Sequence, residues 1–346
     1  MQSTRPTVEA NSAEPPAGRL AIEAENVHVT YADGTEAVRG VDLTVGAGEF
    51  FGFLGPNGAG KTTTIKTLVT LLDPTRGSVR IDGYDTTDES QAVRESIGYM
   101  AQETSVDEEL TARENVRYTC EVYGVPKGAR DDRIAELLEL VGLDDVTDQR
   151  AETFSGGMKK RLDAATVLVH RPPVVFLDEP TTGLDPEARL RFWEYLQSIN
   201  DRGTTVFLTT QYLEEVDRLC DRLALLQDGE VVTTDTPAAL KSAVGGDVLD
   251  VTLVDAADTE RATRAVYRSD AFDAATVEPT DDGLAITAEN VREGINELFR
   301  ALDAAGVAVT GFDVRSPTLD DVFLRLTDDE LESDGDDATR KLEVAR

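Results

Sequence analysis

Apolar and polar residues alternate along two stretches near the start of the chain, LAIEAENVHVTYA (20–32) and AVRGVDLTVGAGE (37–49). Alternation with a period of two is typical of strands that bury one face. Asp33-Gly34 lies between the stretches and favours a tight turn. This part of the chain therefore predicts a strand, a turn and a second strand.

Further along, continuous apolar runs alternate with segments of helical spacing. The runs predict strands buried on both faces of a parallel sheet, and they are FFGFLG (50–55), PVVFLDEP (173–180) and TTVFLTT (204–210). Helical spacing appears at 61–72, through most of 105–170, and at RLRFWEYLQSIN between the last two runs. This alternation predicts an α/β sheet with helices packed against it.

The pattern changes after Gly245-Gly246. Six segments follow in the order strand, helix, strand, strand, helix, strand, which is a split βαβ arrangement. They are DVLDVTLV, TERATRAVYRS, AATVEPT, GLAITA, VREGINELFRALDAAG and VAVTGFDV. The predicted domains are a disordered lead-in (1–18), an α/β domain (19–243) with a helical part at about 103–170, a small α+β domain (247–327) and an acidic, frayed tail (328–346).

Length and composition agree with this division. A chain of 346 residues exceeds one typical core. No apolar run reaches the length of about 18 residues that a membrane-spanning helix needs, and the polar start lacks the apolar region of a secretory signal. Cys120 and Cys220 cannot form a disulfide framework, so the expected setting is a reduced cytoplasm.

The formal charge of −33 predicts a surface that repels nucleic acid and anionic lipid. Acidic residues are scattered along the chain, which favours an acidic coat suited to a salt-rich cytoplasm. The alternative, an acidic region that binds a basic partner, predicts a single patch. Lys159, Lys160 and Arg161 are interpreted as solvent-facing charges of a helix rather than as a nucleic-acid patch.

The segment GPNGAGKT fits the phosphate-binding pattern G-x-x-x-x-G-K-[ST] between a predicted strand and a predicted helix. Its backbone N–H groups and the helix N-terminus would face phosphates. Lys61 would reach the β- and γ-phosphates, and the Thr62 hydroxyl would bind Mg²⁺. The residues expected to bind nucleotide here are Gly55, Pro56, Asn57, Gly58, Ala59, Gly60, Lys61, Thr62 and Thr63.

VVFLDEP supplies carboxylates at the end of a second buried strand, where open α/β sheets bind ligands. Asp178 would hold Mg²⁺, as in P-loop NTPases. Glu179 would accept a proton from the attacking water or orient it. Together with the phosphate loop, these residues predict a P-loop NTPase.

FSGGMKKRLDAA (154–165) resembles the signature sequence of ABC ATPases, and that family's other motifs occur in order over about 20–240. The resemblance implies a mixed-sheet core, an antiparallel β subdomain and a helical subdomain. It implies that Tyr31 stacks on adenine, that Gln102 senses the γ-phosphate and contacts Mg²⁺, and that Asp185 belongs to the D-loop. A half-buried strand tyrosine and a solvated loop glutamine are the alternative interpretations of Tyr31 and Gln102.

Ser155, Gly156 and Gly157 precede a helix and offer a second anion cradle; a plain helix cap is the alternative for Ser155. In the family, two domains pair head to tail and each cradle closes on the ATP that the other holds. The resemblance therefore implies a homodimer with two ATP sites at its interface.

Gln211 departs from the family pattern, because most ABC ATPases have a switch histidine at this strand end. An amide can donate and accept a hydrogen bond but cannot take up a proton near neutral pH, which leaves Glu179 as the base. Gln211, FSGGM and SPTLDDVFLRLT (316–327) together resemble the daunorubicin/doxorubicin-resistance type of export ATPase. Phe323 and Leu324 would dock into an apolar groove, at a dimer contact or within the small domain.

The predicted function is an ATPase subunit that energises a separate membrane permease on the cytoplasmic face of the membrane, with export of drugs or other small hydrophobic compounds implied by the resemblance. LTARENVRYTCEVYGV (110–125) would pass movement to the permease. The alternatives are an importer ATPase whose C-terminal domain senses a ligand, and a soluble ABC ATPase acting on ribosomes or DNA. The acidity argues against direct nucleic-acid contact.

Overall fold

The computed structural model describes residues 18–244, 246–269, 271–272, 275–288 and 291–323. The described chain falls into two compact units that divide after Pro237, each with its own hydrophobic core. Helix α8 (Pro237–Val244) therefore goes almost entirely with the second unit, although the sequence interpretation put 237–243 with the first. The tail predicted at 328–346, and the lead-in apart from Gly18, lie outside the described residues.

The first unit begins with the predicted strand pair, β1 (Leu20–Thr30) and β2 (Glu36–Gly46). With β4 (Arg76–Ile81) and β5 (Tyr84–Asp85) they form an antiparallel sheet in the order β2-β1-β4-β5. Buried and exposed residues alternate from Val41 to Val45, because one face of β2 packs into the core. The alternation in the sequence thus marks a sheet with one covered face.

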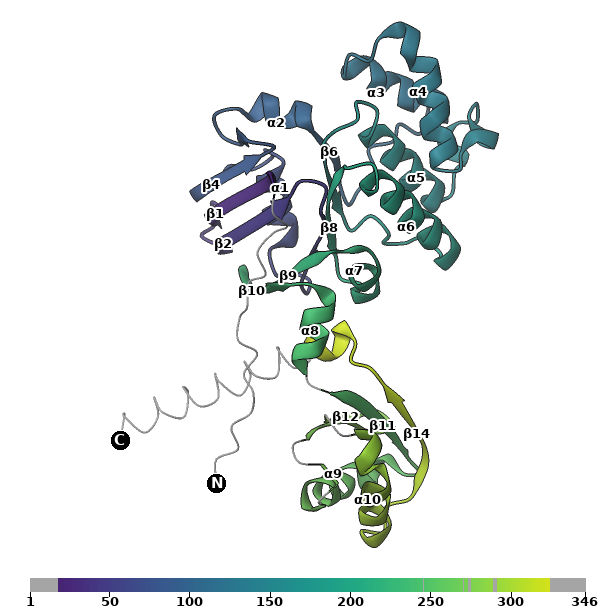
Figure 1. The fold of residues 1–346 in the computed structure, drawn as a ribbon. Helices are drawn as coiled ribbons and strands as arrows, with labels where there is room; N and C mark the ends of the chain where they lie inside the picture. The colour runs from purple at the N-terminus through teal and green to yellow at the C-terminus, as the bar shows by residue number, and fades with distance from the viewer. Residues whose placement is uncertain (1–17, 245, 270, 273–274, 289–290, 324–346) are drawn as a thin grey trace. The chain divides into compact units, whose positions relative to one another are not determined.

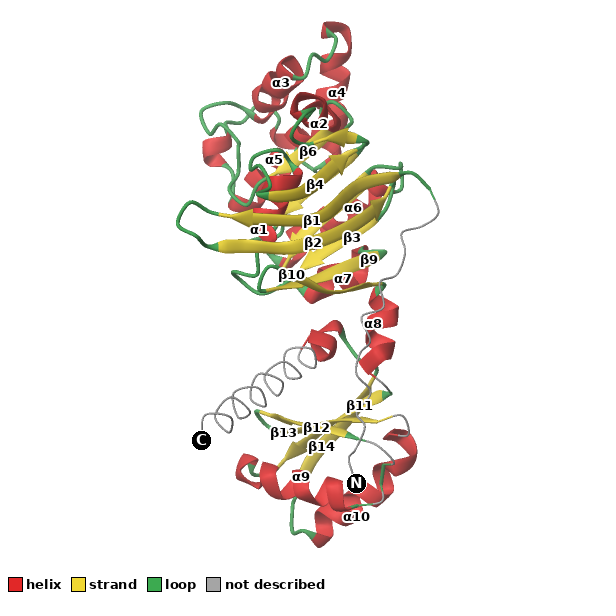
Figure 2. Ribbon diagram, turned by 90° about the vertical axis from the view of Figure 1, so that its left-hand side faces the viewer, coloured by secondary structure: helices red, strands yellow, loops and turns green. Residues whose placement is uncertain are grey.

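A second sheet has the strand order β10-β9-β3-β8-β7-β6, and all its neighbouring pairs are parallel except β9 with β10. Its strands are β3 (Phe50–Leu54), β6 (Ile97–Met100), β7 (Val174–Asp178), β8 (Thr205–Thr210), β9 (Arg222–Gln227) and β10 (Glu230–Asp235). Strands β3, β7 and β8 are buried along their whole length, which confirms the three predicted strands. Parallel strands end at a shared edge, so the segments that follow β3, β6, β7 and β8 meet there (Figure 2).

Seven α-helices of the described chain accompany these sheets in the first unit. They are α1 (Lys61–Leu68), α2 (Ser90–Ser96), α3 (Ala112–Val122), α4 (Lys127–Leu140), α5 (Gly156–Val167), α6 (Pro186–Asn200) and α7 (Leu213–Leu219), with short 3₁₀ turns at Asp144–Val146 and Ala151–Thr153. Helices α3, α4 and α5 gather beyond the β6 edge of the central sheet (Figure 1), which confirms a helical region within 105–170.

The first predicted helix was wrong at its end. Helix α1 stops at Leu68 instead of continuing to 72. Thr70 takes a left-handed backbone with φ of 65°, and the N–H groups of Leu71 and Leu72 both donate to Lys66 O, at 2.8 and 3.2 Å. These bonds satisfy a carbonyl that the helix end would otherwise leave unpaired, and Leu71 is left exposed.

The second unit confirms the predicted order of strands and helices. Its strands β11 (Asp247–Leu253), β12 (Thr276–Thr280), β13 (Gly283–Ala288) and β14 (Val309–Arg315) form an antiparallel sheet in the order β12-β13-β11-β14. Helices α9 (Thr259–Arg268) and α10 (Val291–Ala304) bury apolar side chains against it, after a 3₁₀ turn at Ala256–Asp258. This is a split βαβ domain.

Residues 319–323 form a last short helical segment, of which Leu319 and Val322 are buried. Phe323 is half-buried, and Leu324 lies outside the described residues. Among the described residues, no helix has the length and apolar character needed to span a membrane.

Candidate nucleotide site

The phosphate loop connects β3 to α1 and is shaped by glycines that cannot be replaced without strain. Gly58 and Gly60 have φ of 88° and 105°, in the left-handed region. A Cβ on Gly60 would lie 2.4 Å from Ala37 O, and one on Gly55 would lie 2.3 Å from Leu226 O. The sequence therefore needs glycine for close backbone approach as well as for the turn.

Lys61 lies almost wholly inside this loop, with 5% of its side chain exposed. Its Nζ donates to Gly55 O (2.7 Å) and Pro56 O (3.0 Å), and it lies 3.9 Å from Glu179 Oε1. Burial lowers the pKa of Lys61, and the charges of Glu179 and Asp178 oppose that shift. The ammonium is thus placed between the loop and the carboxylates that follow β7.

Asp178 ends β7 and is 1% exposed. Thr209 of β8 donates through Oγ1 to Asp178 Oδ1 at 2.5 Å. Burial and the charge of Asp178 together raise the pKa of Tyr99, in β6, to about 12, so the neighbouring phenol stays neutral. The hydrogen bond from Thr209 thus fixes the orientation of the Asp178 carboxylate from the neighbouring strand β8.

Glu179 has a left-handed backbone with φ of 49°, which costs a residue with a side chain about 1–2 kcal/mol. Its N–H donates to Thr209 O (3.0 Å) and Thr209 Oγ1 (3.2 Å). Gln102, just after β6, donates through Nε2 to Glu179 Oε2 at 3.3 Å. The structure thus brings Lys61, Gln102 and Glu179 together at one edge of the sheet.

Tyr31 lies in the turn after β1 and is 40% exposed. Its hydroxyl shares a hydrogen bond of 3.0 Å with Thr63 Oγ1, so it lies beside the start of α1. Gln211 follows β8 directly, is exposed, and makes no side-chain hydrogen bond to the described residues. Thr62 is half-buried on the first turn of α1.

The second predicted cradle lies at the start of α5, where Ser155 is the N-cap and accepts a hydrogen bond from Met158 N at 3.3 Å. Ser155 and Gly156 are exposed, and a Cβ on Gly156 would meet no atom within 4 Å. Asp185 caps α6 in the same way, accepting from Ala188 N at 2.8 Å. Among the described residues, no hydrogen bond or ion pair joins Ser155 to the phosphate loop of its own chain.

The interpretation of Lys159, Lys160 and Arg161 as solvent-facing charges was wrong. Lys159 Nζ pairs with Glu108 Oε1 at 2.5 Å, and Lys160 Nζ donates to Glu179 O at 3.2 Å. No residue from Gly157 to Val167 is fully exposed, because neighbouring elements enclose α5. The sequence missed Lys160 and Thr209 as site residues, since their partners lie 19 and 31 positions away along the chain.

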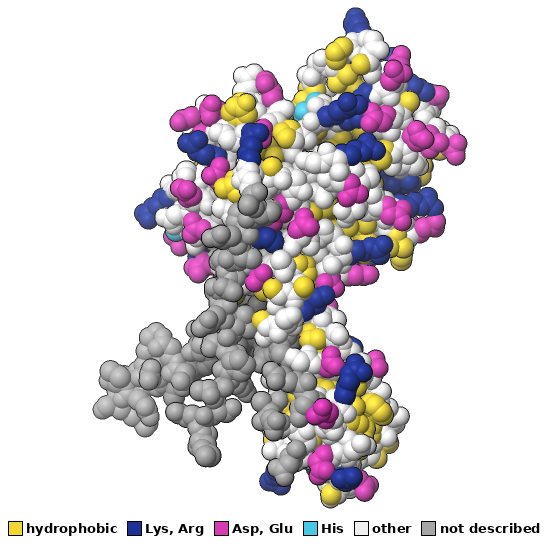
Figure 3. Space-filling view, in the orientation of Figure 1, with side chains coloured by type: hydrophobic (Ala, Val, Ile, Leu, Met, Phe, Trp, Pro, Cys, Tyr) yellow, Lys and Arg dark blue, Asp and Glu magenta, His cyan; other side chains and the backbone are white. Residues whose placement is uncertain are grey.

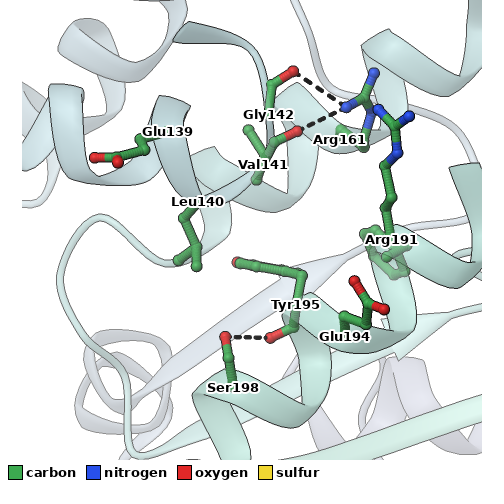
Figure 4. Close-up of a pocket in the computed structure, with 10 residues that line it drawn as sticks. Glu139, Leu140, Val141, Gly142, Arg161, Arg191, Glu194, Tyr195 and Ser198 are labelled. Carbon is green, nitrogen blue, oxygen red and sulfur yellow. Dashed lines mark hydrogen bonds between the residues drawn. The ribbon is translucent and has the colours of Figure 1, made fainter.

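A cavity of about 310 Å³ lies apart from these motifs, between the end of α4, α5 and α6 (Figure 4). Arg161 lines it and donates through Nη1 to Val141 O (2.9 Å) and Gly142 O (3.2 Å). Burial and the charge of Arg191 lower the pKa of Arg161. None of the predicted site residues lines this cavity.

Comparison with known proteins agrees with this geometry. A sequence profile described as "ABC transporter" matches residues 38–182, and one described as "ATP-binding protein DrrA1-3-like, C-terminal domain" matches residues 236–327. The chain is 42% identical over 309 residues to the daunorubicin/doxorubicin resistance ATP-binding protein DrrA of Streptomyces peucetius, covering 89% of this chain and 92% of that protein. It is 34% identical to the linearmycin resistance ATP-binding protein LnrL of Bacillus subtilis, covering 88% and 98%.

Solved structures place the fold in the same group. The dimeric ATP-binding cassette MJ0796 bound to ADP and Pi is similar with a TM-score of 0.58 and 29% identity, over 62% of this chain and 98% of that one. The match to an ABC transporter family profile, the extent of identity to DrrA and the phosphate-site geometry agree. The chain belongs to the ABC transporter family, as an ATP-hydrolysing ATP-binding protein of the daunorubicin/doxorubicin resistance (DrrA) type.

Proposed function

We propose that this ATPase is the energy-supplying subunit of an exporter, in which two copies share two ATP molecules and drive a separate membrane permease. The observation that carries the proposal is the split of the site within one chain. Lys61 and Gln102 contact the two carboxylate oxygens of Glu179. Ser155 and Gly156 of the second cradle are exposed, and within the described part of the chain the Ser155 side chain bonds only its own helix. A second copy, placed head to tail, would supply the missing cradle.

Within each site, the chain's own groups have distinct tasks. Lys61 and the loop amides would hold the β- and γ-phosphates, and Tyr31 would stack on the base. Glu179 would accept the proton of the attacking water, with Gln102 and Lys61 fixing its two oxygens. Gln211 and the partner's cradle would hold the γ-phosphate by hydrogen bonds.

The donor set also fits Mg²⁺, which prefers oxygen ligands. Asp178 offers a buried carboxylate, Thr62 a hydroxyl, and Gln102 an amide oxygen that stays available because its Nε2 faces Glu179. When bound, the ion would neutralise charge that develops on the phosphates.

Relatives named for resistance and export support the direction of transport. They include the DrrA and LnrL proteins and the Nod factor export ATP-binding protein I of Burkholderia orbicola, which is 40% identical over 66% of this chain and 76% of that protein. We propose export of a drug or other small hydrophobic compound, from a position on the cytoplasmic face of the membrane. Tyr118 and Val122 of α3, with Tyr123, are exposed apolar side chains that offer a contact for the permease.

The decisive experiment is Glu179→Gln in the full chain. ATP binding should persist while turnover falls by about 10²-fold or more, and light scattering should show a stable dimer with ATP but not with ADP. Near-normal hydrolysis would remove Glu179 as the base, and an ATP-loaded monomer would remove the shared site. Purification with an integral membrane protein, followed by vesicle transport, would then separate exporter from importer.

A further inference from the structure

Helix α5 contacts three parts of the nucleotide site, two of them through side chains that the proposed mechanism has not used. Ser155 caps its start. Lys160 Nζ donates to the main-chain oxygen of Glu179 at 3.2 Å. Asp163 Oδ1 accepts from Ser105 Oγ (2.5 Å) and Ser105 N (3.3 Å), in the loop that holds Gln102. One helix therefore touches the cradle, the base and the γ-phosphate sensor loop.

The hydrogen bond from Lys160 is accepted by a residue with a strained backbone. Glu179 adopts the left-handed conformation, which is unfavourable for a residue with a side chain. Its N–H is fixed by Thr209, and its carbonyl oxygen accepts from Lys160 Nζ and, at 3.3 Å, from Thr182 N in its own turn. Lys160 is the partner that comes from another element of the fold, so its position helps to set where the Glu179 carboxylate points.

The ammonium of Lys160 is surrounded by carboxylates that favour its charged form. Burial lowers the pKa of Lys160, and the charges of Glu179, Asp163, Glu215 and Asp178 oppose that shift. Asp163, Glu215 and Asp178 are 2%, 0% and 1% exposed. A half-buried ammonium beside buried carboxylates offsets part of the cost of removing those carboxylates from water.

We propose that Lys160 is a positioning residue for Glu179, and that it links the two nucleotide sites of the dimer. Ser155 and Lys160 are separated by about 7.5 Å of helical rise on one rigid element. When Ser155 closes on the partner's nucleotide, any displacement of α5 would therefore also move Lys160 and the Glu179 carbonyl that it bonds in the same chain. The link rests on the proposed head-to-tail dimer; the positioning role rests on contacts within one chain.

The test is Lys160→Met in the full chain, which removes the donor and the charge but keeps most of the stem. We expect kcat to fall about tenfold while KM for ATP stays within about twofold, because the lost contact acts on the base and not on the nucleotide. Lys160→Arg should restore most of the rate. The matched control is Lys159→Met, the neighbouring lysine paired with Glu108, which should leave kcat within about twofold.

If Lys160→Met does not fold, Lys160→Gln keeps a polar side chain of shorter reach and should show the same loss of kcat. Wild-type turnover in either folded variant, or a rise in KM at unchanged kcat, overturns the positioning role. The link is tested by combining Lys160→Met with Ser155→Ala. A double variant slowed less than the product of the single effects supports it, and full multiplication overturns it.

The Glu179→Gln dimer separates this inference from the proposed function. Trapping of the ATP-bound dimer by Glu179→Gln, both alone and combined with Lys160→Met, supports the shared site independently of turnover. Failure to trap the dimer overturns the shared site and the link between the two sites. The positioning role of Lys160 is then still decided by the ratio of kcat between Lys160→Met and the wild type.

Discussion

At the scale of single residues, the site is set by short side chains on neighbouring strands. Thr209 Oγ1 donates to Asp178 Oδ1 and accepts from the backbone N–H of Glu179, so one hydroxyl fixes the Asp178 carboxylate and the Glu179 main chain. Gln211 follows two residues later at the same strand end. A neutral amide there can hold a phosphate oxygen but cannot carry a proton.

Substitutions of Gln211 test whether this side chain acts only by hydrogen bonding, without proton transfer. Gln211→Ala should lower kcat about tenfold with a smaller change in KM, because a hydrogen bond made in the transition state is lost. Gln211→His should keep the bond and add a titration near pH 6.5 to the pH–rate profile. Steady-state kinetics from pH 5.5 to 8.5 would show it, and a rate indifferent to both changes would place residue 211 outside the site.

Sequence could predict contiguous motifs but not contacts between distant segments. Gly55 to Thr62 are contiguous and run from the loop into the first turn of α1, so their spacing alone predicts a phosphate cradle. Lys160 could not be assigned, because its role depends on Glu179 lying across the fold and on neighbours that enclose α5. Partial burial of a lysine by tertiary packing leaves no mark in the spacing of its own helix.

At the scale of elements, the order of strands and helices followed from periodicity, and their ends followed from local backbone chemistry. The βαββαβ pattern of the second unit was predictable, since its strands alternate and its helices are amphipathic. The end of α1 was not, because a left-handed Thr70 has no reliable signal in the sequence. The same holds for the anchoring of the segment 319–323.

That segment is fixed by a charged clip. Arg315, at the end of β14, donates to both oxygens of Asp321, at 2.6 and 2.9 Å, and through Nε to Asp250 Oδ2 at 2.7 Å. Burial would raise the pKa of Asp321, but hydrogen bonds from Arg315 and Thr318 outweigh it and lower the pKa below its ordinary value of 3.8. A carboxyl with a lowered pKa stabilises the fold above 3.8 and loses that contribution as the pH falls through the folded-state pKa.

Asp321→Asn should therefore destabilise the second unit at pH 7 by about 1–2 kcal/mol, a figure reduced by the partial exposure of Arg315. The difference from wild type should shrink as the pH falls below 3.8. Denaturant unfolding followed between pH 3 and 7 would measure both effects. The control is Asp313→Asn, which removes an exposed carboxylate on β14, the strand of Arg315. An equal loss of unfolding free energy in this control would assign the effect to net charge and not to the Arg315–Asp321 contact.

At the scale of the whole molecule, the dominant feature is charge. Figure 3 shows acidic side chains spread over the visible face and interleaved with lysines and arginines, without a single acidic patch. With a formal charge of −33, repulsion between like charges opposes compaction at low salt. The Debye length shrinks from about 10 Å at 0.1 M to about 3 Å at 1 M salt, so salt should relieve most of this repulsion.

We expect the first thermal unfolding transition to rise by about 5 °C or more between 0.1 and 2 M KCl. The matched control is a chain with Glu36→Gln, Asp88→Asn and Glu214→Gln, three exposed carboxylates that form no ion pair with described residues. It should unfold at a higher temperature than wild type at 0.1 M KCl, and its dependence on salt should be weaker, because the variant has less repulsion to screen. Calorimetry of both chains decides the matter: a transition that stays level or falls with KCl would show that attractive ion pairs, not net repulsion, dominate the electrostatics of this fold.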